Sequence, residues 1–194
     1  MSTKKIDQNW DKADDYLIDA AKKAGIDVGI MVKIAGFESK FNDTARPIST
    51  SRPHLNKTTQ FDGTKAMSSA YGYGQFLDGT WQEMLNKYGE KYGVPDAGNL
   101  NKEEANQHRG NKHLQAYMLA EFTRENIELG RRLGGLDDDA NVYALHNLGK
   151  GDGVNFKSPQ GWSQSACVKY FVFKSYSSEP VFIWGWISFC SGRI

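Results

Sequence analysis

One glutamate, Glu38, lies where a carboxyl group could do acid chemistry. Residues 28–42 read VGIMVKIAGFESKFN, and Met31 and Ile34 recur at the spacing of one helix face. Glu38 continues this face, so its side chain is expected to point toward the core or a cleft wall. Partial removal from water raises a carboxyl pKa, which makes Glu38 a candidate general acid. The alternative is a helix-end glutamate that turns to solvent and pairs with Lys40.

Two further short motifs carry residues suited to binding a polar ligand. Residues 71–76 read YGYGQF, and residues 144–149 read ALHNLG. The glycines of the first motif would let the backbone approach a ligand, and the Gln75 amide could both donate and accept hydrogen bonds. Tyr73 could stack on a ring of the ligand or be a core aromatic. A tight turn with a structural Gln75 is the alternative.

In their order and spacing the three motifs resemble those of the lytic transglycosylase family, which has a lysozyme-like fold and is related to goose-type lysozyme. The family has a Glu-Ser pair closing a helix, matched by Glu38-Ser39. Its Gly-x-x-Gln turn is matched by residues 72–76, followed by Thr80-Trp81. Its Ala-Tyr-Asn-x-Gly motif is matched by residues 145–149, with His146 where tyrosine is usual. The resemblance covers roughly residues 10–156.

The resemblance implies a peptidoglycan lytic transglycosylase with Glu38 as its acid and base. Such an enzyme cleaves the MurNAc–GlcNAc β-1,4 bond and leaves 1,6-anhydro-muramic ends. An acid must protonate the leaving oxygen as an oxocarbenium-like centre develops, and a hydrolase usually adds a second carboxylate. The family needs none, because the substrate's N-acetyl group can assist. Asp43 and Asp62 are the nearest candidates for a hydrolytic partner, or else solvated turn residues.

The same resemblance gives residues around Glu38 a role in substrate binding. They are Ser39, Tyr73, Gln75, Phe76, His146 and Asn147. Ser39 would orient Glu38 or contact the substrate, unless it is an ordinary helix-end hydroxyl. A neutral His146 would donate to Glu38, whereas a protonated one would lower the pKa of Glu38. A core histidine with no link to Glu38 is the remaining alternative.

Mainly helices are expected to position these residues. One helix is expected over residues 6–24 and another, capped by Asp27, carries Glu38. Capping boxes at Thr80-x-x-Glu83 and Asn101-x-x-Glu104 predict two more, the second running toward Leu129, and residues 137–139 begin a further helix. Residues 42–69 have no sustained period, which predicts a long irregular or short-β segment after the helix of Glu38. The fold class is therefore mainly α, with a lysozyme-like helical domain.

The last part of the chain differs in composition from the rest. Residues 157–194 hold three of the five tryptophans and both cysteines, Cys167 and Cys190. The expected organisation is a lysozyme-like transglycosylase domain over residues 1–156 and an atypical aromatic-rich C-terminal tail over 157–194. The tail could be a wall-binding module, a segment packed on the core, or non-native sequence after a frame change.

Composition and charge exclude several functional classes. The formal net charge of +1 gives no electrostatic footprint for nucleic acid, and the cysteines and histidines show no metal-ligand spacing. No cofactor or metal is expected, and the longest apolar stretch is too short to span a bilayer. The N-terminus does not read as a secretory signal peptide.

The expected partner is therefore the glycan strand of peptidoglycan, bound by a monomer. We expect a phage endolysin or a virion-associated enzyme, held in the host cytoplasm before release or in the virion, that acts on the wall in the periplasm. The rival in the same class is a muramidase that hydrolyses the same bond with water. A catalytically silent glycan-binding or virion structural protein is the rival from another class.

Overall fold

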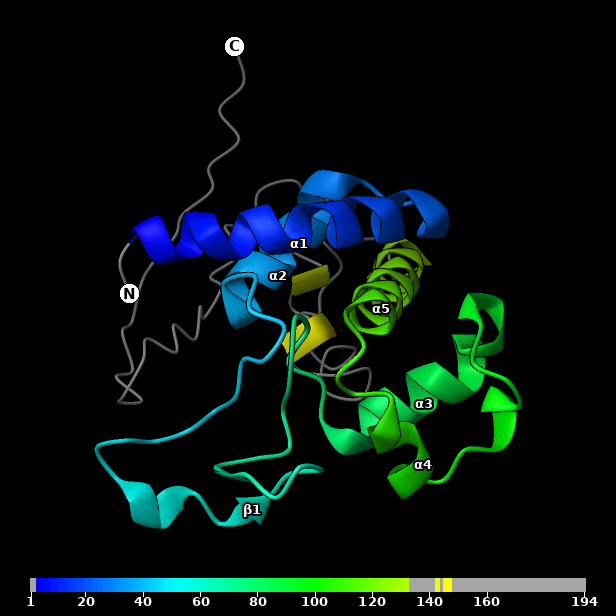
Figure 1. Cartoon of the computed structure of the whole chain (residues 1–194). Helices are drawn as coiled ribbons and strands as arrows, with labels where there is room; N and C mark the ends of the chain where they lie inside the picture. The colour runs from blue at the N-terminus through cyan, green and yellow to red at the C-terminus, as the bar shows by residue number, and fades with distance from the viewer. Residues whose placement is uncertain (1–2, 133–141, 144, 148–194) are drawn as a thin grey trace, which may run out of the picture.

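The computed structural model describes residues 3–132, 142–143 and 145–147. Within these ranges the chain is mainly helical, as the sequence predicts (Figure 1). The expected helix start at residues 137–139 and the aromatic-rich tail at 157–194 lie outside the described residues. No helix in the described ranges is both long and apolar enough to cross a bilayer.

Two consecutive helices open the chain and carry Glu38, as expected. Helix α1 spans Thr3–Ala24 and α2 spans Val28–Ser39. Between them Gly25 adopts a φ of +71°, which suits a residue without a Cβ. The Asp27 side chain then accepts a hydrogen bond from the backbone N–H of Ile30 at 3.0 Å. This cap satisfies a donor that the start of a helix would otherwise leave unpaired.

A long irregular segment with a small hairpin follows α2, which confirms the expectation for residues 42–69. It contains a 3₁₀ turn, η1 (Pro53–Leu55), and the antiparallel strands β1 (Thr58–Thr59) and β2 (Lys65–Ala66). Buried side-chain bonds hold the segment together in place of a longer sheet. The Gln60 amide donates to the carbonyls of Ser68 and Ala70 at 3.0 and 2.9 Å.

Helix α3 begins earlier than its sequence pattern predicts. It spans Asp78–Tyr88, and the residue before it, Leu77, makes no side-chain cap. The predicted capping box at Thr80-x-x-Glu83 is therefore wrong. The helix needs no local cap because the Asp78 N–H donates to the hydroxyl of Ser69, at 3.2 Å, across the preceding turn.

The helix predicted to run unbroken toward Leu129 is two helices. After the 3₁₀ turns η2 (Glu90–Tyr92) and η3 (Ala97–Asn99), the Asn101/Glu104 capping box forms as expected and opens α4 (Lys102–Gln107). Helix α5 then spans Lys112–Arg132. The break follows from a second cap, because the Asn111 side chain accepts a hydrogen bond from the Leu114 N–H at 3.2 Å.

Helix α5 is the central element of the core. It packs against α1, α2 and α3, and Figure 1 shows α1 crossing one end of it. Fully buried apolar side chains from all four helices meet there, among them Leu17, Met31, Met84 and Leu119. Helix α2, which carries Glu38, and helix α3 are therefore both held against α5.

A buried carboxylate, Glu121, ties α5 to the 3₁₀ turn η2 that follows α3. Its side chain is 0% exposed and bonds Lys91, the Tyr92 hydroxyl and Arg124 at 2.6, 2.7 and 2.8 Å. Burial alone would raise the pKa of Glu121, but these bonds outweigh it and hold the pKa below its ordinary value. The carboxylate is therefore ionised and fully paired.

Removing this charge tests how much the network stabilises the fold. We expect Glu121→Gln to lower the free energy of unfolding by about 2 kcal/mol at pH 7, because the variant loses charge-assisted bonds. The pKa of Glu121 is depressed in the folded state, so the loss is present above the ordinary carboxyl pKa and fades as pH falls below it. Denaturant unfolding at pH 7 and pH 3 measures both.

Glu128→Gln is the matched control on the same helix. Glu128 also pairs with Arg124, but its side chain is 54% exposed. An exposed pair contributes little, so this change should cost well under about 1 kcal/mol. Equal losses in the two variants would contradict the stabilising role of the buried network.

Candidate active site

Glu38 lies one residue before the end of α2, and its carboxyl group is turned inward. The buried face of the helix includes Met31 and Ile34, and Glu38 continues it with a side chain that is 17% exposed. Burial raises the pKa of Glu38 to about 7. No charge on another described residue contributes to this shift. A carboxylic acid of this kind can donate a proton near neutral pH.

The second motif forms a tight turn between the exit of α2 and α3. Tyr71 and Phe76 close it as a β-bridge, and Gln75 adopts a φ of +49°, unusual for a residue with a Cβ. The Gln75 amide nitrogen donates to the carbonyls of Ala45 and Gly72 at 3.0 and 2.9 Å. Both of its N–H groups are thus used within the fold, which supports the structural alternative for Gln75.

The glycines of this turn make room for α5 and not for a sugar. A Cβ on Gly72 would overlap the side-chain oxygen of Gln115, and Gly72 also has a φ of +76°. A Cβ on Gly74 would lie 3.0 Å from a methyl group of Leu119. The expected approach of a glycan to these backbone atoms is therefore wrong, because α5 occupies the space.

Tyr73 and Phe76 belong to the core. Tyr73 is 1% exposed, so the alternative of a core aromatic holds and stacking on a sugar ring is wrong. Phe76 is also buried, and its ring packs against Phe122 and His146 at centroid distances of 5.2 and 5.9 Å. A direct substrate contact by Phe76 is likewise wrong, because its surface is covered by these neighbours.

His146 links the third motif to the second. Its Nε2 lies 3.0 Å from the Gly74 carbonyl oxygen and 3.9 Å from Oε1 of Glu38. The carbonyl can only accept, so Nε2 carries the proton and donates to Gly74. The expected hydrogen bond from His146 to Glu38 is not formed at this distance. Burial lowers the pKa of His146 to about 4, so the ring is neutral at pH 7 and leaves the pKa of Glu38 high.

Ser39 and Asn147 bond to the backbone of their own helical segments. The buried Ser39 hydroxyl donates to the Ala35 carbonyl at 2.9 Å, which is the alternative of a helix-end hydroxyl. The exposed Asn147 amide donates to the Tyr143 carbonyl at 3.0 Å. These bonds leave Ser39 without access to a substrate and Asn147 with access from the solvent side.

Tyr143 is a neighbour of Glu38 that the motif comparison missed. Its ring lies 5.5 Å from the ring of Phe37, the residue before Glu38. Burial raises the pKa of Tyr143, and the charge of Glu38 raises it further. Helical spacing could have found it, because Tyr143 is three residues before His146 and shares its helix face.

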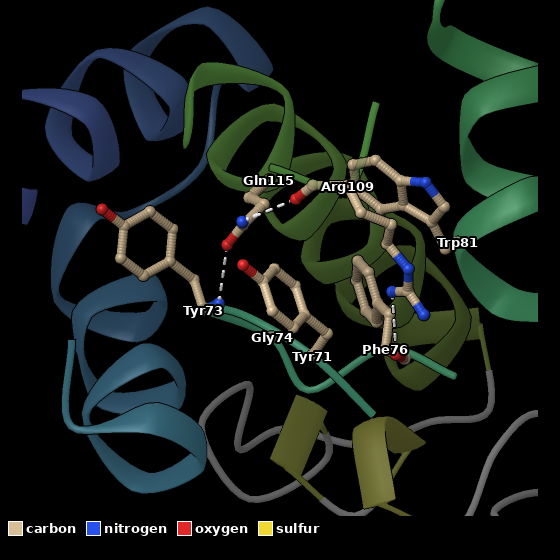
Figure 2. Close-up of a pocket in the computed structure, with 7 residues that line it drawn as sticks. All are labelled: Tyr71, Tyr73, Gly74, Phe76, Trp81, Arg109 and Gln115. Atoms are coloured by element: carbon tan, nitrogen blue, oxygen red, sulfur yellow. Dashed lines mark hydrogen bonds between the residues drawn. The ribbon is translucent and has the colours of Figure 1, made fainter. Parts of the chain in front are cut away.

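Two buried polar residues behind the turn were also missed. Arg109 donates to the carbonyls of Phe76 and Ser69, each at 3.0 Å, and Figure 2 shows the bond to Phe76. Gln115 of α5 bonds both Tyr73 and Arg109 (Figure 2). The pocket in this view is lined by residues of the turn together with Trp81, Arg109 and Gln115, and Glu38 does not line it. No local sequence pattern predicts these two roles, because both side chains bond groups that are distant in the chain.

The two candidate carboxylates for hydrolysis are both held in ion pairs. Asp43 lies 3.3 Å from the Lys112 amine, and Asp62 lies 2.6 Å from the Arg46 guanidinium. The hydrogen bond from Arg46 holds the pKa of Asp62 below its usual range. Within the described ranges, no three His, Cys, Asp or Glu side chains are arranged to hold a metal ion.

The comparison with known families covers the part of the chain that holds Glu38 and the second motif. Residues 5–98 match the family model described as Transglycosylase SLT domain. No solved structure matches the chain. The match includes α1, α2, the hairpin segment, the tight turn and α3, and it stops before α4 and α5. Residues 5–98 thus match the transglycosylase SLT domain, and this match supports a lytic transglycosylase of the lysozyme-like superfamily that acts on peptidoglycan.

Proposed function

We propose that Glu38 is the sole acid and base of a reaction that cleaves the MurNAc–GlcNAc β-1,4 bond and leaves a 1,6-anhydro-muramic end. The observation that carries this proposal is the inward-turned carboxyl group of Glu38, whose pKa burial raises to about 7. At neutral pH a large fraction of this group is protonated, which an acid catalyst requires. The same pKa makes its ionised form an adequate base.

The proposed reaction uses Glu38 twice, first as an acid and then as a base. Protonated Glu38 donates to the glycosidic oxygen while the bond from C1 to that oxygen breaks, and the substrate's N-acetyl oxygen stabilises C1. Ionised Glu38 then accepts the proton of the 6-hydroxyl group of the same MurNAc, whose oxygen bonds to C1. The anhydro ring closes and Glu38 returns to its protonated form, so no water is consumed.

The environment of Glu38 supports a proton donor. The neighbouring ring of His146 is kept neutral by burial and directs its proton to the Gly74 carbonyl. An imidazolium 3.9 Å from the carboxyl group would stabilise its ionised form and leave less acid at neutral pH. Burial of His146 thus favours the acid role of Glu38, because it keeps the neighbouring ring uncharged.

The ion pairs of Asp43 and Asp62 support transglycosylation over hydrolysis. A hydrolase needs a carboxylate free to activate water or to attack C1. Asp43 is paired with Lys112 and Asp62 with Arg46, so each has a charge partner that holds it in its own loop. The substrate's own hydroxyl is therefore the nucleophile that this proposal assigns.

The products of digestion test the proposal directly. We expect mass spectrometry of muropeptides released from purified peptidoglycan to show anhydro-muramic ends, and Glu38→Gln to abolish their release. Glu103→Gln, a change in an exposed residue of α4, should leave the products unchanged. Reducing ends would instead establish a muramidase. Binding to insoluble peptidoglycan without release by the wild-type protein would establish a silent glycan binder.

The pH dependence of the rate follows from the pKa values of Glu38 and His146. We expect kcat/KM on soluble glycan strands to be high between pH 4 and 7 and to fall about tenfold per unit above pH 7, because the acid form of Glu38 disappears. Below about pH 4 the charged His146 should reduce it again. A rate that rises steadily from pH 6 to pH 9 would contradict Glu38 as the acid.

The stability of the fold should show the same pKa in a measurement without substrate. The pKa of Glu38 rises from 4.5 to about 7 on folding, so ionisation opposes folding above pH 7 and has no effect below pH 4. We expect Glu38→Gln to raise the free energy of unfolding by about 3 kcal/mol at pH 8. At pH 4 the two proteins should unfold alike. An equal difference at both pH values would contradict the raised pKa.

A further inference from the structure

Gln115 is a buried side chain of α5 that the proposed chemistry does not use. It is 5% exposed, and its amide joins three separate stretches of chain. Its Oε1 accepts from the Tyr73 N–H at 3.0 Å, and its Nε2 donates to the carbonyls of Asp43 and Arg109 at 3.0 and 2.8 Å. Both N–H groups and the carbonyl of the amide are thus engaged.

Two of these partners flank Glu38. Asp43 lies in the stretch that leaves α2 just after Glu38, and Tyr73 lies in the tight turn of the second motif. The two stretches also meet directly, because the Gly72 N–H donates to the Ala45 carbonyl at 3.0 Å. Gln115 therefore sets the distance between the end of the catalytic helix and the turn.

The second-motif turn also positions His146, the ring beside Glu38. The residue after Tyr73 is Gly74, whose carbonyl accepts from His146 at 3.0 Å. The His146 ring lies 3.9 Å from the Glu38 carboxyl group and helps to keep it from water. A shift of the turn would move the Gly74 carbonyl and release His146 from this position.

We propose that Gln115 is a positioning residue for glycan cleavage: it fixes the second-motif turn against the exit of α2 and thereby keeps His146 packed against Glu38. Gln115 does not touch the reacting atoms. The proposal rests on the proposed function only in naming Glu38 as the group that is positioned.

The absence of a Cβ at Gly72 leaves room for the Gln115 side chain. Any Cβ at position 72 would overlap the Gln115 oxygen, so the turn can reach this bond only with glycine there. Gly93 has a similar left-handed φ, +85° against +76°, but a Cβ on Gly93 would meet nothing within 4 Å. The requirement at Gly72 is thus contact with Gln115 in addition to backbone conformation.

Gln115→Met tests the proposal, because methionine fills a similar volume and makes none of the three hydrogen bonds. We expect kcat on soluble glycan strands to fall about 10- to 100-fold with little change in KM, since the reacting groups are misplaced and not lost. We also expect carbon NMR titration to show the pKa of Glu38 falling from about 7 toward 4.5, as water reaches the carboxyl group.

Tyr117→Phe is the matched control on the same helix. It removes the hydrogen bonds of the Tyr117 hydroxyl with Lys23 and Asp19, which join α5 to α1 away from Glu38. This variant should lose thermal stability yet keep kcat and the pKa of Glu38. A folded Gln115→Met protein with wild-type kcat and wild-type Glu38 pKa would overturn the proposal.

Gly72→Ala and Gly93→Ala form a second pair should Gln115→Met fail to fold. Both substitutions put alanine at a left-handed φ, but only the first forces the turn away from Gln115. We expect Gly72→Ala alone to lower kcat and the pKa of Glu38. Equal values of kcat and of the Glu38 pKa in the two variants would overturn the positioning role.

The NMR titration separates this proposal from the proposed function. If the wild-type protein releases no glycan, the proposed function fails, and the pKa of Glu38 in Gln115→Met still tests the positioning. If the wild-type protein cleaves and Gln115→Met matches it in kcat and Glu38 pKa, only the role of Gln115 fails.

Discussion

The structure depends on keeping one carboxyl group partly out of water without giving it an opposite charge. A buried carboxyl group beside a cation would be ionised at neutral pH and would have no proton to donate. One in open solvent would have an ordinary pKa and would be ionised as well. At Glu38 burial is the cause of the raised pKa, and the neighbouring His146 is itself kept neutral. The raised pKa of Glu38 thus comes from burial, beside a ring that carries no charge.

Several other carboxylates in the described part of the chain are paired with cations. Glu121 of α5 bonds a lysine and a tyrosine of η2 and an arginine of α5, and Glu125 pairs with Lys87 of α3. Asp78 is held by Arg109 behind the turn. Such pairing stabilises ionised carboxylates, and Glu38 has the reverse environment. A native protein has a net stability of only about 5–15 kcal/mol, so a penalty of about 3 kcal/mol at Glu38 is a substantial part of it.

The sequence predicted the helices and the irregular segment better than it predicted the hydrogen bonds between residues that are distant in the chain. The helix of Glu38, its Asp27 cap and the irregular segment after it could be read from local pattern, because spacing and capping are properties of neighbouring residues. The start of α3 and the break before α5 could not. The first depends on Ser69 across a turn, and the second on an asparagine cap that competed with a continuous apolar pattern.

The candidate site shows the same division between local and distant causes. Glu38 was found because its burial follows from its own helix. Tyr73 and the glycines of the turn are buried against α5, and the Gln75 amide donates to the carbonyls of Ala45 and Gly72, so these residues have structural roles that the local sequence did not indicate. Arg109 and Gln115 lie in a stretch that resembles no motif, and their function appears only when the chain is folded.

The second motif therefore connects α5 to the stretch that follows α2, the helix of Glu38. Its glycines allow contact with Gln115 and Leu119, its amide groups bond the exit of α2, and its Gly74 carbonyl orients His146. None of these contacts requires a ligand. A short motif of glycines and a glutamine can thus support a buried glutamate, because it holds the histidine that packs beside it. The glycines and aromatic rings of the motif face the core.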